Sequence, residues 1–201
     1  ADAQLLLPQG ESVLNAPPPV VFAERLGDEG APTVLFYGHY DVQPPEPLEA
    51  WETPPFEPTV KDGRVYCRGA QDDKGQVFAF LCGLRELLAA RPECSPINLK
   101  ILLDGQEESG SIGLFKLLED RAFRKRLAAD VMLVSDTSAG PDLRPAIIAG
   151  LRGVNHFTVT LTAANRDLHS GEYGGIAPNA AQGMAELILK HGGAERGCAI
   201  G

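Results

Sequence analysis

The stretch TVLFYGHYD, residues 33–41, decides the fold class, because an apolar run stops abruptly at polar side chains. Val34–Tyr37 follow the turn-like sequence GDEGAP and predict an interior strand of a sheet. His39 and Asp41 stand where that strand ends, and one long loop leads from them to the paired aspartates Asp72 and Asp73. The strand therefore ends in groups that could take part in a polar site.

The same pattern recurs along the first 150 residues. INLKILL (97–103) and DVMLVS (130–135) predict two further strands. Apolar residues at helical spacing predict one helix from the DDKG loop to Arg91 and another over about 111–127. We also expect PVVFAER (19–25) and TVLFYG (33–38) to form a hairpin. Strands alternating with amphipathic helices predict an α/β fold with a mixed, mostly parallel sheet and flanking helices.

A different pattern begins after Gly150. FTVTLT (157–162) alternates apolar residues with threonine, which is typical of a strand with one face in water. A helix is predicted from about Pro178 to the pair Gly192–Gly193. We therefore expect two domains, residues 1–150 and 151–201, the second of α+β type.

Composition limits the partners. The formal net charge is −9 and no basic run occurs, so neither nucleic acid nor a membrane surface is expected as a partner. The four cysteines, Cys67, Cys82, Cys94 and Cys198, lack CxxC spacing, which favours free thiols in a reducing compartment. With no spanning segment or signal peptide in the sequence, we expect a cytoplasmic protein.

The ends of the predicted strands carry most of the candidate site residues. Ligands of open α/β sheets bind beyond the carboxyl ends of the strands. Those ends and the loop before the first helix hold carboxylates and one imidazole: His39, Asp41, Asp72, Asp73, Glu107, Glu108 and Asp136. Crowded carboxylates repel one another unless a cation neutralises them, and this donor set suits zinc, manganese or cobalt. The pattern predicts a hydrolase with two divalent ions, most simply Zn²⁺.

Each motif alone also fits a structural role. The His39–Asp41 pair could cap a loop, and Asp72–Asp73 could stabilise the helix that follows. Glu107–Glu108 could be a solvated pair, and Asp136 could belong to a simple turn. Their placement at successive strand ends favours a shared site.

Five motifs together identify a family resemblance. GHYDVQP, WETPPFEPTVKDGRVYCRGAQDDKG, DGQEESGS, VSDT and NRDLHSGEYGG resemble, in order and spacing, the carnosinase-like metallodipeptidases. These belong to a larger family of dinuclear exopeptidases and deacylases that includes carboxypeptidase G, acetylornithine deacetylase and succinyl-diaminopimelate desuccinylase. The resemblance implies a zinc-exopeptidase-like catalytic domain, with residues 151–201 beginning an inserted lid and dimerisation domain.

The resemblance also implies residue roles. Metal ligands would be His39 and Asp136 for one ion, Glu108 for the other, and Asp72 as the bridge. Glu107 would be the general base that takes a proton from the metal-bridging water, and Asp41 would orient His39. His169 would stabilise the oxyanion in the partner subunit of a homodimer. The family's second metal also takes a late histidine, so we expect this chain to be an N-terminal fragment; His156 and His191 are interpreted as structural.

The predicted activity is hydrolysis of the peptide bond of a dipeptide or similar small peptide. WETPPFEPTV favours the dipeptidase branch by resemblance alone. An N-acyl amino-acid deacylase and an inactive metal-binding or dimerisation fragment stay open as alternatives. A phospho-accepting signalling domain would explain Asp136 but not His39 or Glu107–Glu108, and is set aside.

Overall fold

The structure is a computed structural model that describes residues 3–8, 16–91, 96–138, 144 and 146–191. The chain divides into two compact units, Ala1–Ile148 and Ala149–Gly201. Within the described residues, the first unit holds all strands and the second holds two helices. No helix in these ranges is both long and apolar enough to cross a bilayer.

A five-stranded mixed sheet forms the centre of the first unit, in the order β1-β2-β6-β3-β7. Its strands are β1 (Gln4–Leu6), β2 (Val20–Arg25), β3 (Thr33–His39), β6 (Asn98–Asp104) and β7 (Val131–Val134). The pairs β3–β6 and β3–β7 are parallel, whereas β2 runs antiparallel to both of its neighbours. The predicted fold class, a mixed and mostly parallel sheet with flanking helices, is confirmed.

The predicted hairpin between residues 19–25 and 33–38 is wrong. β6 lies between β2 and β3 and pairs with both. The side chain of Asn98 holds the connecting segment against the start of β6, accepting a hydrogen bond from the Gly27 amide (2.8 Å) and donating one to the Ala31 carbonyl (2.7 Å). The apolar run of β6 is better buried between two strands than at an edge, and this outweighs the local turn signal.

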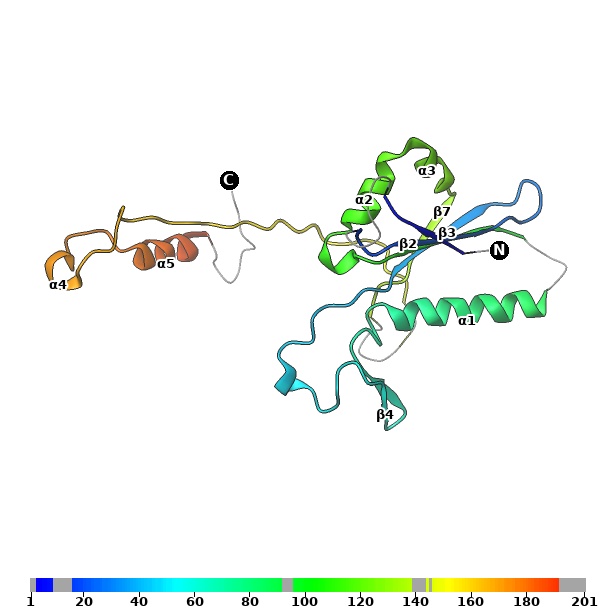
Figure 1. The fold of residues 1–201 in the computed structure, drawn as a ribbon, viewed down its shortest axis with the longest axis horizontal. Coiled ribbons are helices and arrows are strands. Elements are labelled where there is room, and N and C mark those ends of the chain that lie inside the picture. Colours follow the sequence, from blue (N-terminus) through cyan, green and yellow to red (C-terminus); the bar gives the residue numbers. More distant parts are fainter. Residues whose placement is uncertain (1–2, 9–15, 92–95, 139–143, 145, 192–201) are drawn as a thin grey trace. The chain divides into compact units, whose positions relative to one another are not determined.

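Helices cover both faces of the sheet (Figure 1). On one face, α2 (Ile112–Glu119) and α3 (Arg121–Arg126) pack onto the main apolar core, where Phe22 meets Phe123 edge to face at 6.1 Å. On the other face, α1 (Lys74–Ala90) places Phe80 flat against the buried Phe36, with ring centroids 3.7 Å apart. These two layers hold the strands in fixed register.

The start of α1 lies very close to the end of β3. A Cβ atom on Gly38 would come within 2.6 Å of a Val77 methyl group and 2.7 Å of an Asp73 oxygen, so only glycine fits there. This contact brings the aspartate pair at the start of α1 next to His39.

The predicted helix over residues 111–127 is divided in two. Asp120 takes an extended conformation between α2 and α3, and its carboxylate accepts a hydrogen bond from the Ala122 amide (2.8 Å). An aspartate at this position caps a new helix better than it continues an old one. The chain bends here, so that two short helices form in place of one.

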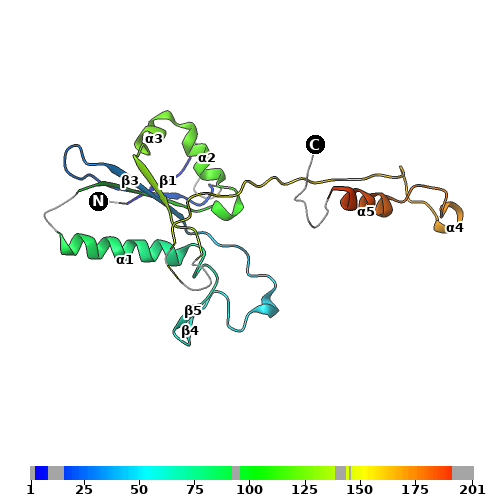
Figure 2. The ribbon, with the colours of Figure 1, turned by 180° about the vertical axis from the view of Figure 1, so that it is seen from behind.

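The long loop after β3 contains a second, smaller sheet. β4 (Thr59–Lys61) and β5 (Arg64–Tyr66) form a hairpin, which Figure 2 shows apart from the main sheet. Asp62 and Gly63 both have positive φ, as in a two-residue hairpin turn. Before it, a short helix η1 (Leu48–Ala50) lies near Trp51, whose ring stacks under the Arg68 guanidinium at 5.1 Å.

The second unit differs from its sequence pattern. Residues 157–162, predicted as a strand, form none, because the described part of this unit offers no other strand to take their backbone hydrogen bonds. Its helices are α4 (Ser170–Tyr173) and α5 (Ala180–His191). Helix α5 confirms the helix that was predicted from about residue 178. The predicted end of that helix, at Gly192–Gly193, lies outside the described residues.

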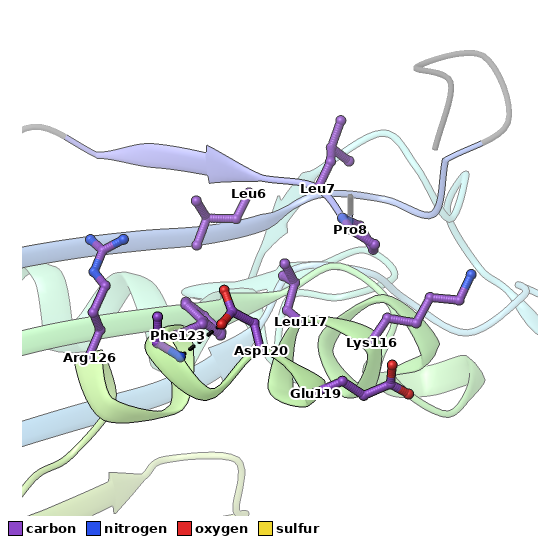
Figure 3. A pocket seen from close by; sticks show the side chains of 10 residues that line it. Leu6, Leu7, Pro8, Lys116, Leu117, Glu119, Asp120, Phe123 and Arg126 are labelled. Atoms are coloured by element: carbon purple, nitrogen blue, oxygen red, sulfur yellow. Dashed lines mark hydrogen bonds between the residues drawn. The ribbon is translucent and has the colours of Figure 1, made fainter. Parts of the chain in front are cut away.

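A pocket of about 830 Å³ opens between β1 and α2–α3, with Leu6 and Pro8 on the side of the helices and Leu7 pointing away from them (Figure 3). Two of its charged side chains make structural contacts. Asp120 caps α3, and Arg126 donates hydrogen bonds to Gln4 and Glu24 while its guanidinium lies over the Phe22 ring. We interpret this pocket as part of the packing of β1.

Candidate metal centre

The register of the parallel strands brings the predicted site residues together. His39 lies opposite Asp104 across the β3–β6 pair, and Tyr37 lies opposite Val134 across β3–β7. The chain continues from Asp104 into the turn η2 (Glu107–Ser109), and from Val134 to Asp136. Parallel strands end at the same edge of a sheet, so segments distant in sequence converge there.

His39 is fully buried and both of its ring nitrogens face carboxylates. Nδ1 lies 3.2 Å from the Asp41 Oδ1 atom and 3.2 Å from the Asp41 carbonyl oxygen. Nε2 lies 2.9 Å from Asp72 Oδ1 and 3.6 Å from Asp136 Oδ2. A proton on Nδ1 would be held by Asp41, which leaves the Nε2 lone pair directed toward the other two carboxylates.

Three of these residues form a candidate metal site: His39, Asp72 and Asp136 each offer a ligand atom, and the three atoms lie within 4.8 Å of one another. One imidazole nitrogen with two carboxylate oxygens is a donor set that zinc accepts. The side chains differ in exposure, from fully buried His39 through Asp136 (30% exposed) to Asp72 (63% exposed), so the cluster opens to solvent on one side.

Asp73 supports this cluster from beneath. Its side chain is fully buried at the start of α1, and Oδ2 accepts a hydrogen bond from the His39 backbone amide at 3.1 Å. Its other oxygen, Oδ1, is buried without a hydrogen-bond partner in the described residues. Such an oxygen beside crowded carboxylates is expected next to a cation and is costly without one, so the residues present fit a bound divalent ion.

The two adjacent glutamates lie on η2, directly beside this cluster. Their backbone amides donate to the two carboxylate oxygens of Asp41, at 3.1 Å for Glu107 and 3.0 Å for Glu108. Asp41 therefore holds His39 and the glutamate turn at once. The carboxylate of Glu108 accepts a hydrogen bond from Gln43 and lies outside the three-donor cluster.

The pKa values of His39, Glu107 and Asp136 all lie above their usual values, through burial, neighbouring carboxylates or both. Burial lowers the pKa of His39, but Asp136, Glu107, Asp41 and the hydrogen bond to Asp72 raise it above its usual value. Burial raises the pKa of Glu107, His39 lowers it, and the carboxylates of Asp136, Glu108 and Asp41 raise it further. Burial and Asp72 likewise raise the pKa of Asp136. A divalent ion would relieve this repulsion.

The remaining predicted residues do not join this cluster within the described structure. His169 lies in the second unit, where its Nδ1 accepts a hydrogen bond from the Gly171 amide (3.0 Å) at the start of α4. His156 is an exposed residue of the same unit, and the His191 side chain lies outside the described part. Their predicted roles stay predictions.

Gln43 was missed by sequence reasoning. Its amide donates to the Glu108 carboxylate at 2.7 Å and to the Glu108 carbonyl oxygen at 3.1 Å. The signal was present in GHYDVQP, because His39, Asp41 and Gln43 occupy every second position from the end of a strand onward. Alternate residues of an extended segment point the same way.

The fold and the donor cluster define an α/β protein with a candidate metal centre at the carboxyl ends of its parallel strands. More specifically, the chain belongs to peptidase family M20/M25/M40, whose family model matches residues 35–190.

Several relatives of this chain are dipeptidases. It is 38% identical to human Beta-Ala-His dipeptidase over 182 residues, covering 90% of this chain and 35% of the relative. It is 38% identical to the Cys-Gly metallodipeptidase of Schizosaccharomyces pombe over 162 residues, covering 79% and 33%. The crystal structure of human carnosine dipeptidase 1 matches with a TM-score of 0.62 and 31% identity, over 94% of this chain and 40% of that one. The chain thus spans about a third of the length of these curated relatives.

Metal binding at this cluster should weaken as the pH falls. A ligating imidazole must be neutral, and the raised pKa of His39 keeps it protonated to a higher pH than an ordinary histidine. We expect zinc affinity to be highest above that pKa and to fall as the pH is lowered through it, with protons released on binding. Calorimetry between pH 8 and 6, in two buffers of different ionisation enthalpy, measures both. His156→Gln should leave the profile unchanged, and a pH-independent affinity would contradict the role of His39.

Proposed function

We propose that the protein containing this chain is a metal-dependent hydrolase that cleaves the peptide bond of dipeptides or similar small peptides. The observation that carries the proposal is the donor cluster His39, Asp72 and Asp136 with Glu107 beside it, in a chain of a peptidase family. The dipeptidase names of its relatives support the substrate class.

In this proposal the reaction divides between the cluster and the glutamate turn. A divalent ion held by His39, Asp72 and Asp136 would supply Lewis acidity toward the scissile carbonyl and make water more acidic. Glu107 accepts the proton of the attacking water and later delivers it to the leaving amine. The Glu107 carboxylate lies close enough to His39 and Asp136 for their charges to affect its pKa, so a proton acceptor stands beside the ligands of the ion. Asp41 fixes His39 and the backbone of Glu107 relative to each other.

We further propose two zinc ions, with Asp72 as the shared ligand and Glu108 as a ligand of the second. The exposed position of Asp72 supports this, since one face of its carboxylate is open to a second ion. Glu108 also lies close enough to raise the pKa of Asp136 through its charge.

The proposal extends to a homodimer in which His169 of one subunit reaches the site of the other. The hydrogen bond from Gly171 to Nδ1 supports the role, because the neutral ring then carries its proton on Nε2 and can donate it to an oxyanion. We propose a cytoplasmic location, which the free thiols of Cys67 and Cys82 support.

The proposed activity can be tested on the complete protein with Cys-Gly and β-Ala-His as substrates and N-acetyl amino acids as competing ones. We expect dipeptide cleavage that stops on chelation and returns with zinc. Preferential cleavage of the N-acetyl compounds would replace the dipeptidase by a deacylase of the same family. A folded, metal-loaded protein without hydrolysis of either substrate would favour the inactive alternative.

A further inference from the structure

Gln43 makes an unusual pair of contacts with a single residue. Its Nε2 atom donates to Glu108 twice, at 2.7 Å to the carboxylate Oε2 and at 3.1 Å to the backbone oxygen. A side chain that only stabilised the loop would need no more than the hydrogen bond to the Glu108 backbone oxygen. The shorter bond is the one to the charged group, and such charge-assisted bonds are the stronger kind.

The segment after β3 thereby supports the glutamate turn at three points. Asp41 receives the amides of Glu107 and Glu108, and Gln43 holds the other side of Glu108. This segment directly follows His39, the last residue of β3, which faces Asp72 and Asp136. One short stretch of chain, from His39 to Gln43, therefore contacts both the three-donor cluster and the Glu108 carboxylate.

We propose that Gln43 is a positioning residue that orients the Glu108 carboxylate for binding the second metal ion. This inference rests on the proposed function, in which Glu108 is a ligand of that ion. A hydrogen bond to one oxygen restricts the rotation of a carboxylate, and removal of such an outer partner typically weakens metal binding about 10–100-fold.

The test uses Gln43→Met in the complete protein, made metal-free by chelation. Methionine keeps the length of the side chain and removes both donated bonds. In calorimetric titration with zinc, we expect the second binding step to weaken about 10–100-fold while the first changes less than about twofold. The matched control is Gln4→Met on β1, which removes the hydrogen bond that the Gln4 side chain accepts from Arg126 on α3. This control should change neither binding step.

A second measurement needs no metal. Hydrogen exchange of the metal-free protein should accelerate about three- to tenfold at the η2 amides in Gln43→Met, because the turn loses two of its hydrogen bonds. Unchanged exchange, or equal weakening of both zinc steps, would overturn the proposal. If the unaltered protein binds fewer than two ions, the two-ion part of the proposed function fails, and the exchange result alone decides whether Gln43 positions Glu108.

Discussion

Glu107→Gln in the complete protein should lower turnover about 10²–10⁴-fold while leaving the bound metal in place. The Glu107 side chain lies beside the cluster without belonging to the three donors, so its loss removes a proton acceptor and no ligand of that cluster. Glutamine keeps the size of the side chain and the hydrogen bond from the backbone amide to Asp41. A loss of turnover would therefore not be explained by a change in structure. Steady-state kinetics and metal analysis of the purified variant measure both parts.

The matched control is Glu86→Gln, the same chemical change on the exposed face of α1. It should leave turnover and metal content unchanged. Near-normal activity of Glu107→Gln would place the base elsewhere, whereas loss of one metal would mean that Glu107 and Glu108 have exchanged roles.

His169→Ala should lower turnover about 10²–10³-fold, the cost of removing one oxyanion donor, with little change in metal content or stability. His169 lies in the second unit at the start of the four-residue helix α4, where its loss removes one local hydrogen bond. His156→Ala, at an exposed histidine of the same unit, is the matched control and should remain active.

Mixing the two inactive variants tests action between subunits. If His169 acts across a dimer, mixed dimers of His169→Ala and Glu107→Gln contain one site with both groups intact, and part of the activity should return. Each variant alone should stay nearly inactive. No recovery after demonstrated subunit exchange would confine His169 to its own chain.

Continuous apolar runs and helical spacing were enough to predict the elements that build the site. β6 and β7 formed where INLKILL and DVMLVS predicted strands, and α1 ends where its spacing indicated. The order of the strands in the sheet was not predictable from neighbouring segments. The place of β6 beside β2 depends on pairing across about 80 residues, as between Phe22 and Leu102.

Short polar signals were harder to weigh. Asp62–Gly63 is a strong signal for a hairpin turn. The hairpin was nevertheless not predicted, because the segment between the end of the strand and Asp72 was interpreted as one long loop. Asp120 could have been recognised as a cap but stood within a convincing helical pattern. The threonine alternation of 157–162 predicts only the capacity to form a strand, since pairing also requires a neighbour. The sequence predicted that His39, Asp72 and Asp136 lie near one another, whereas the contacts of Asp41 and Gln43 with η2 depend on how two loops pack together.

The parallel register of β3 with β6 and β7 makes the candidate metal centre a reporter of correct folding. A slip of β3 by one residue would turn His39 to the opposite face of the sheet and take it away from Asp136. An ion that binds only the correctly paired sheet would add about 2.7 kcal/mol to the free energy of unfolding when its free concentration is a hundred times its Kd. Metal supply would then select one strand alignment over its competitors, so the cofactor of the proposed reaction would also act as a ligand for the fold.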